Sequence, residues 1–125
     1  MQRYLLIAIG GAFGSMARFW VTSAVNARLG SAFPYGTLAV NMAACLVIGF
    51  LITSAVRRTG VHSAWRFLVA VGFIGAFSTF STFEWETYST VRSGAFLVAA
   101  IYACGSLLFG LIGVWSGAKV AEALS

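Results

Sequence analysis

The chain has 125 residues, of which 60% are hydrophobic and only 9% are charged, and its formal net charge is +5. Ordinary globular chains carry about 25% charged residues, so this composition leaves too little polar surface for a soluble domain. The basic residues stand singly or in one pair between long apolar runs, which argues against a nucleic-acid-binding protein.

Four apolar segments are long enough to cross a membrane as helices. A bilayer core of about 30 Å needs about 20 mostly apolar residues, and residues 4–24, 36–56, 64–88 and 94–114 qualify. Residues 25–35, 57–63 and 89–93 connect them, and the first span is expected to be part of the mature protein. Because each span must satisfy its own backbone hydrogen bonds in lipid, we predict an all-α membrane protein with one four-helix transmembrane domain over residues 1–125.

Small residues in the first and last spans predict close helix packing. Gly10, Gly14 and Arg18 are spaced by four residues, as are Gly113 and Gly117. Glycines at this spacing let helix backbones approach closely, and alone they favour assembly without a pore. The two cysteines, Cys45 and Cys104, lie in apolar runs and are expected to behave as small hydrophobic residues.

The basic residues give only a weak preference for one orientation in the membrane. Five lie on the side of the N-terminus, namely Arg3, Arg57, Arg58, Arg66 and Lys119. Three lie on the opposite side, namely Arg18, Arg28 and Arg92. A bias this small permits insertion in both orientations. It therefore suggests an antiparallel pair of chains.

Polar residues stand on one face of the second and of the fourth span. Thr37 and Asn41 are four residues apart in the second, and Tyr102 and Ser106 have the same spacing in the fourth, followed by Gly110. The Asn41 amide either bonds a neighbouring helix or lines a polar pathway. Ser106 either contributes to that pathway or bonds back to its own helix.

The third span contains the stretch GFIGAFSTFSTFEWE, residues 72–86. Gly75 tolerates unusual backbone dihedrals, and the Ser and Thr side chains that follow can satisfy backbone groups that a helix releases. We therefore predict a break in the third helix at residues 75–79, whose free carbonyls could bind a cation. Phe80 and Phe83 share a face beyond the break and either pack ordinarily or turn their positive ring edges toward an anion.

These motifs together resemble the Fluc (CrcB) fluoride channel family. The resemblance rests on GGAFGSMARF at residues 10–19, YGTLAVN at 35–41, the stretch at 72–86, and Tyr102 with Ser106, in this order. It implies an antiparallel, dual-topology homodimer in the bacterial inner membrane, with two pores that carry F⁻ passively down its electrochemical gradient and lower cytoplasmic fluoride. It also implies roles for single residues: Asn41 as a donor to fluoride, Phe80 and Phe83 as an aromatic box, Thr37, Ser81, Thr82, Tyr102 and Ser106 as hydroxyls along the route, and Arg18 in a vestibule.

The resemblance further implies a structural Na⁺ on the two-fold axis of the dimer. Its ligands would be the main-chain carbonyls of Gly75 and Ser78 from both chains. Two positions depart from the family pattern: Ser78 stands where a Thr is familiar, and Gly110 stands where another hydroxyl can occur. The first should matter little to a carbonyl ligand, whereas the second leaves the inner end of the hydroxyl track open.

Two other functions compete with a channel. A small dual-topology, proton-coupled exporter of cationic drugs would need a titratable group in the membrane, and Glu84 and Glu86 lie toward the end of the third span. A subunit that assembles without transporting would use only the glycine faces. An enzyme is not expected, because His62 is alone in a connection and no Ser/His/Asp set or metal-ligand cluster is present in the sequence.

Overall fold

The computed structural model describes residues 1–57 and 63–124, and all regular structure within them is helical. Four stretches of these residues are long and apolar enough to cross a membrane, namely Gln2–Leu29, Tyr35–Val56, Arg66–Arg92 and Phe96–Ala123. The prediction of an all-α chain with four membrane-spanning helices is confirmed. The greater part of the predicted connection at residues 57–63, with Arg58, Gly60 and His62, lies outside the described residues.

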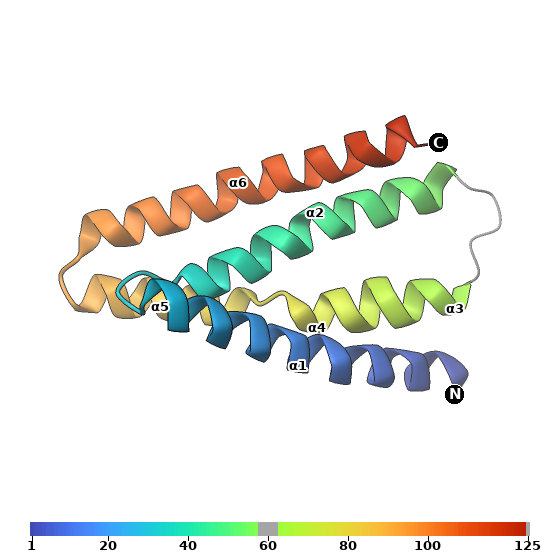
Figure 1. Ribbon diagram of the computed structural model, residues 1–125, viewed down its shortest axis with the longest axis horizontal. Helices are drawn as coiled ribbons and strands as arrows, with labels where there is room; N and C mark the ends of the chain where they lie inside the picture. Colours follow the sequence, from blue (N-terminus) through green and yellow to red (C-terminus); the bar gives the residue numbers. More distant parts are fainter. Residues whose placement is uncertain (58–62, 125) are drawn as a thin grey trace.

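The elements follow one another as α1 (Gln2–Leu29), α2 (Tyr35–Arg57), α3 (Ser63–Trp65), η1 (Arg66–Ile74), α4 (Gly75–Phe77), α5 (Phe80–Arg92) and α6 (Phe96–Ala123), where η1 is a π-helix. The two termini lie at one end of the molecule, and the turns at residues 30–34 and 93–95 lie at the other (Figure 1). Successive spans therefore run in opposite directions.

Several helices extend beyond the predicted apolar spans. α1 and α6 have 28 residues each, which corresponds to about 42 Å of helix, enough to cross the headgroup regions as well as the hydrocarbon core. Residues 89–92, predicted as a connection, belong to α5, and Arg92 is in its last turn, where a cation interacts favourably with the helix dipole. The turn comes after them, at Gly94, whose φ of 83° favours glycine.

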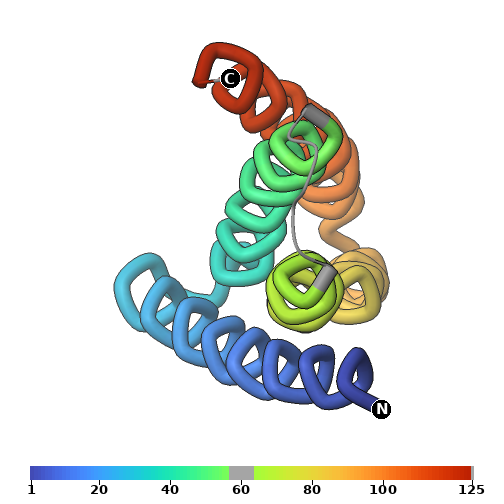
Figure 2. The backbone as a smooth tube through the Cα atoms, turned by 90° about the vertical axis from the view of Figure 1, so that its right-hand side faces the viewer, coloured from blue at the N-terminus to red at the C-terminus, as the bar shows by residue number. Residues whose placement is uncertain are grey.

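α1 packs against η1 through glycine (Figures 1 and 2). A Cβ atom on Gly10 would overlap the carbonyl oxygen of Leu68, and one on Gly14 would overlap that of Phe73. Leu68 and Phe73 are five residues apart, and the i→i+5 spacing of a π-helix brings such residues onto neighbouring positions of one face. Both contacts therefore depend on the absence of a side chain in α1 and on the wider turn of η1.

α2 and α6 form the second closely packed pair (Figure 1). A Cβ atom on Gly117 would overlap the carbonyl oxygen of Leu46, and one on Gly113 would lie 3.3 Å from the Cβ of Cys45. Together with the contacts of Gly10 and Gly14, these confirm that the predicted glycine faces pack helices together.

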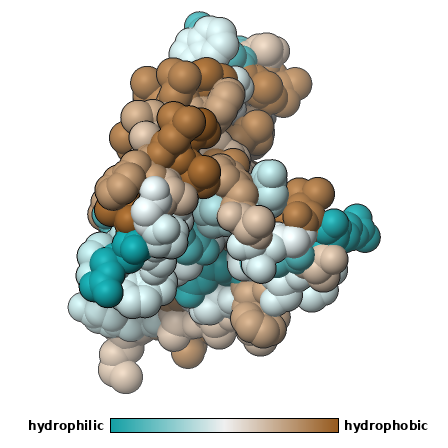
Figure 3. Space-filling model, turned by 90° about the vertical axis from the view of Figure 1, so that its left-hand side faces the viewer, coloured by the Kyte–Doolittle hydropathy of each residue, from teal (hydrophilic) through white to brown (hydrophobic). Residues whose placement is uncertain are grey.

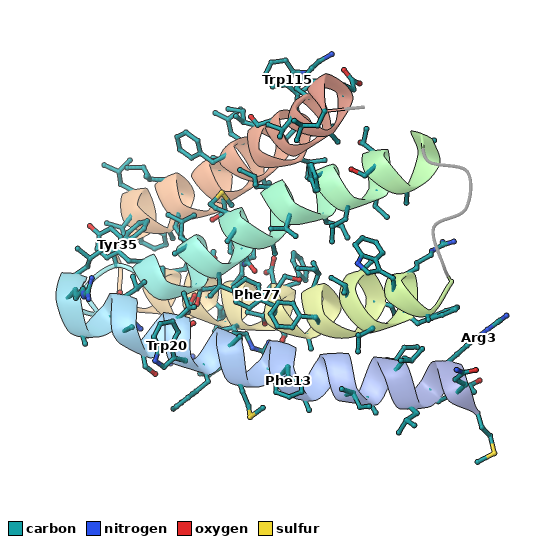
Figure 4. All side chains as sticks on the ribbon, turned by 45° about the vertical axis from the view of Figure 1, so that its right-hand side comes forward. Arg3, Phe13, Trp20, Tyr35, Phe77 and Trp115 are labelled. Atoms are coloured by element: carbon teal, nitrogen blue, oxygen red, sulfur yellow. The ribbon has the colours of Figure 1, made fainter. Side chains whose placement is uncertain are left out.

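Large apolar side chains cover the outside of the bundle. Phe13, Trp20 and Trp115 point away from it (Figure 4) and are more than half exposed. Seen from the end that carries the turns at residues 30–34 and 93–95, apolar residues cover the upper part, whereas hydrophilic residues gather lower down (Figure 3). An apolar exterior suits a chain whose solvent is lipid.

Two residues between α4 and α5 have extended backbone. Ser78 has φ −75° and ψ 160°, and Thr79 has φ −151° and ψ 117°. Gly75, with φ −61° and ψ −33°, is helical, so the unusual dihedrals predicted for it are wrong. The Thr79 side chain accepts a hydrogen bond from the amide of Thr82 and thereby caps α5. Hydroxyl residues, and not glycine, thus have the extended dihedrals between α4 and α5.

Candidate functional site

The Asn41 side chain bonds the extended backbone at Thr79 from both sides. Its Nδ2 donates to the Thr79 carbonyl at 3.0 Å, and its Oδ1 accepts from the Thr79 amide at 2.8 Å. The pair of bonds fixes the orientation of the amide, because only Nδ2 can donate and only Oδ1 can accept. The interpretation of Asn41 as a bond between helices is therefore confirmed, since it links α2 to the start of α5.

One N–H of Asn41 remains available in this arrangement. An amide nitrogen carries two hydrogens, and within the described residues only the one directed to Thr79 has a partner. Asn41 also lines a cavity of about 220 Å³ between α2, α5 and α6. We call it the Phe83 cavity, and its lining residues are Asn41, Met42, Cys45, Ser78, Thr79, Phe80, Phe83, Ser106 and Leu107. The structure thus brings four of the predicted pathway residues, Asn41, Phe80, Phe83 and Ser106, to one space.

The two phenylalanines of this cavity differ in their surroundings. Their ring centroids are 5.8 Å apart, with an angle of 39° between the ring planes. Phe83 is 7% exposed and packs against Tyr102, with 5.1 Å between centroids. Phe80 is 71% exposed. The single chain therefore buries one ring of the predicted pair and leaves the other uncovered.

Ser106 Oγ is buried and has no hydrogen-bond partner among the residues that the structure describes. The alternative in which it bonds back to its own helix is therefore wrong. Gly110 is buried one turn later, where a Cβ atom would lie 3.4 Å from Cys45 Sγ. A buried hydroxyl without a partner is costly, so Ser106 is a place where a ligand of the cavity would find an unused donor.

A second cavity of about 270 Å³ lies on the other side of Thr79, and we call it the Arg18 cavity. Its lining residues are Ser15, Arg18, Phe19, Thr22, Thr37, Thr79, Thr82 and Glu86. Thr79 lines both cavities. Arg18 is half-buried, makes no ion pair with another described residue, and lines the same cavity as Glu86.

The Glu86 carboxylate accepts hydrogen bonds from two of the hydroxyls predicted to line the pathway. Thr37 Oγ1 donates to one carboxylate oxygen at 2.7 Å, and the Tyr102 hydroxyl donates to the other at 2.7 Å. Thr37 and Tyr102 are 2% and 1% exposed, so these protons are directed to Glu86 and not to solvent. The carboxylate thereby ties α2, α5 and α6 together beside the Arg18 cavity.

Glu86 was not among the residues predicted to line the pathway. It lies four residues after Thr82 and three after Phe83, on the face of α5 that carries both. This spacing, together with the rarity of ionisable residues inside membrane spans, was a usable signal. Ser81, by contrast, was predicted as a pathway hydroxyl but is exposed and lines neither cavity.

The main-chain carbonyls of Gly75 and Ser78 have lost their usual helical donors. In a continuous helix the amide of Thr79 would donate to the Gly75 carbonyl, and that of Thr82 to the Ser78 carbonyl. Here the first donates to Asn41 Oδ1 and the second to Thr79 Oγ1. Neither amide bonds the oxygen that it would reach in a continuous helix, and oxygen is the donor atom that a hard cation prefers.

Comparisons with known proteins agree over nearly the whole chain. The family model described as CrcB-like protein, Camphor Resistance (CrcB), matches residues 5–118. Three similar proteins are each named Fluoride-specific ion channel FluC. The one from Solibacter usitatus is 44% identical over 97% of this chain and 99% of its own length. That from Acidobacterium capsulatum is 42% identical over 95% of both chains, and that from Geobacter sulfurreducens is 39% identical over 99% of this chain and 100% of its own. The chain described above therefore belongs to the CrcB family.

Proposed function

We propose that this chain is the subunit of a fluoride-selective channel in a bacterial cell membrane. It would carry F⁻ passively down its electrochemical gradient and so lower cytoplasmic fluoride, without catalysing a reaction. One observation carries the proposal: relatives that match this chain over almost its full length are named fluoride-specific ion channels. Thr79 lines both cavities, and this supports a route that passes it.

Fluoride holds its water tightly, so a selective route has to replace hydration by hydrogen bonds that remain weak enough to release the ion. Arg18 would raise the local concentration of anions at the Arg18 cavity. Beyond Thr79, the free N–H of Asn41 and the unpartnered Ser106 hydroxyl are the donors of the Phe83 cavity. The edges of Phe80 and Phe83 would add weak, positive contacts. None of the residues that line the Phe83 cavity carries a fixed charge that could trap the ion.

We further propose that two chains pair in antiparallel fashion and form two pores. Phe80 is 71% exposed beside the Phe83 cavity, and a Cβ atom added to Gly75 would meet nothing within 4 Å. A second chain would cover both positions and complete the aromatic box. The near balance of basic residues between the two ends supports insertion in both orientations. Labelling of an added C-terminal cysteine in intact cells should reach about half of the chains if both orientations occur.

We also propose that Ser78 and Thr79 form a break in the third span. A Na⁺ ion would bind beside this break, on the two-fold axis of the dimer. The carbonyl oxygens of Gly75 and Ser78 would hold the ion, because their helical donors are engaged elsewhere. The ion would supply positive charge where main-chain oxygens of two chains converge. The extended backbone of Ser78 and Thr79 supports this role, because it redirects the two amides away from these oxygens.

Fluoride efflux from vesicles tests the proposal most directly. Purified protein is reconstituted into liposomes loaded with KF or KCl, valinomycin is added, and halide release is followed with ion-selective electrodes. We expect fluoride release and retention of chloride, with strongly slowed fluoride release for Phe80→Ile and Asn41→Asp. Liposomes that retain both halides would contradict a channel and favour an assembly subunit. Uptake of a cationic dye driven by a proton gradient, and lost on Glu86→Gln, would favour the exporter.

A further inference from the structure

Cys45 lines the Phe83 cavity although it was expected to be an ordinary apolar residue. It follows Asn41 by four residues on α2, so the two side chains share one face of the helix. It is a free, half-buried cysteine, in contact with the same space as Asn41, Phe80 and Phe83. A cysteine in this position could simply pack against its neighbours. The residues on the opposite wall of the cavity indicate a further role.

That wall is α6, where hydroxyls recur every four residues and then stop. Tyr102 and Ser106 carry hydroxyls, whereas Gly110 has no side chain. A Cβ atom at Gly110 would lie 3.4 Å from Cys45 Sγ and 3.6 Å from Met42 Cε, so the thiol borders the space that a side chain at position 110 would enter. Ser106 Oγ, on the same cavity, is buried and without a partner among the described residues. The cavity thus contains one hydroxyl without a partner, that of Ser106, and the thiol of Cys45 lies beside the next turn of α6, at Gly110.

We propose that the Cys45 thiol is part of the ion pathway, as the polar group that continues the α6 hydroxyls past Ser106. The proposal rests on the proposed fluoride channel. A thiol is a weak S–H donor and a polarizable group, so it would help an anion leave the stronger donors at Asn41 and Ser106 without holding it. A weak site of this kind suits the exit from a stronger one, because conduction requires release as well as binding.

Cys104 provides a matched control within the chain. It is also a free cysteine in a membrane span, but it is exposed on the outside of α6 and lines neither the Phe83 cavity nor the Arg18 cavity. A reagent that acts through thiols in general would act at both residues. A reagent that acts through the pathway would act only at Cys45.

Methyl methanethiosulfonate is a suitable probe because it is small and neutral. The cysteine thiolate attacks the sulfenyl sulfur of the reagent, a new S–S bond forms, the S–S bond of the reagent breaks, and methanesulfinate leaves with the electron pair. The product carries a methylthio group on Sγ. In Cys104→Ala protein, this group would fill part of the Phe83 cavity and lower fluoride efflux at least about tenfold.

Protection by fluoride links the thiol to the ion. Labelling of Cys45 in the Cys104→Ala protein, measured by mass spectrometry, is expected to be at least about threefold slower at saturating fluoride than in chloride, because an ion in the cavity excludes the reagent. Labelling of Cys104 in the Cys45→Ala protein should proceed equally fast in both salts. A purely structural cysteine would give no such difference.

Substitutions then separate the thiol's polarity from its volume. Cys45→Ser keeps a donor of nearly the same size, whereas Cys45→Val is similar in size but has none. We expect fluoride efflux through the Ser variant to exceed that through the Val variant by about tenfold, equivalent to about 1.4 kcal/mol in barrier height. Unfolding curves of both variants establish whether each is folded.

The outcomes are distinct. Efflux that is unchanged by labelling, or labelling that fluoride does not slow, would overturn the role of Cys45. Equal efflux through folded Ser and Val variants would do the same. If unlabelled Cys104→Ala protein released no fluoride at all, the proposed function would fail instead. Protection of Cys45 by fluoride would then still decide whether the thiol faces an anion site.

Discussion

Replacing Asn41 by Leu should destabilise the chain through two main-chain groups at once. The substitution keeps roughly the side-chain volume but removes both the donor at 3.0 Å from the Thr79 carbonyl and the acceptor at 2.8 Å from the Thr79 amide. Thr79 is 8% exposed, so water cannot fully replace either partner. Each buried group left unsatisfied costs about 1–3 kcal/mol. We therefore expect the free energy of unfolding to fall by about 2–6 kcal/mol.

Asn26 is a matched control, because its amide makes one such bond instead of two. Asn26 Oδ1 accepts from the buried amide of Gly36 at 3.1 Å. Asn26→Leu therefore leaves one main-chain group unsatisfied, and its expected loss is about 1–3 kcal/mol. Both variants are measured by unfolding in mixed micelles of a mild detergent and SDS, with helicity followed by circular dichroism.

The same two variants, Asn41→Leu and Asn26→Leu, should also differ in fluoride efflux. Asn41→Leu should lower fluoride efflux at least about tenfold beyond any loss of folded protein, because it removes a pathway donor, whereas Asn26→Leu should lose efflux only in proportion to unfolding. If the two variants lost the same unfolding free energy, the pair of hydrogen bonds between Asn41 and Thr79 would not stabilise the fold as their geometry indicates. If Asn41→Leu stayed folded and released fluoride as fast as wild type, Asn41 would not be a donor of the pathway.

Three further predictions follow from the packing and the carbonyls. Tyr102→Phe removes a hydrogen bond to the Glu86 carboxylate and should cost about 1.5–3 kcal/mol of unfolding free energy; an unchanged unfolding curve would contradict that bond. Gly14→Ala places a Cβ atom on a main-chain carbonyl and should cost about 1–3 kcal/mol of unfolding free energy, whereas Gly11→Ala, whose Cβ would have no neighbour closer than 3.9 Å, should be nearly neutral when unfolded in the same mixed micelles. Replacing Na⁺ by N-methylglucamine throughout purification should lower the melting temperature and fluoride efflux, because an ion bound only to the folded protein stabilises it; identical values in both cations would count against the Na⁺ site.

The sequence predicted the four spans well because lipid imposes a strong demand on composition. It placed their ends poorly because apolar character marks only the part of a helix within hydrocarbon. Residues 89–92 look like a connection by polarity, yet they continue α5. A helix that has begun satisfies its backbone most easily by going on through the headgroups, until a residue such as Gly94 turns the chain.

The sequence predicted several residues of the candidate site but not the hydrogen bonds between them. Asn41 and the stretch at residues 72–86 both stood out, yet the bond between Asn41 and Thr79 joins residues 38 positions apart and needs the packing of α2 against α5. For the same reason the sequence did not predict that Thr37, which lines the Arg18 cavity, donates its proton to Glu86. The π-helical turns of η1, which pack closely against α1, were not predicted from composition or periodicity.

The π-helix also sets the register of everything that follows it. Loss of one residue anywhere in η1 (Arg66–Ile74) would let the wide turns relax into an ordinary α-helix, in which each residue advances by about 100°. The downstream half of the span would then shift relative to α1, and Thr79 would shift with it relative to α2. A single-residue deletion here is therefore expected to be far more damaging than a conservative substitution at the same place, although no residue of η1 lines either cavity. In evolutionary terms, the length of this segment should be held more strictly than its composition.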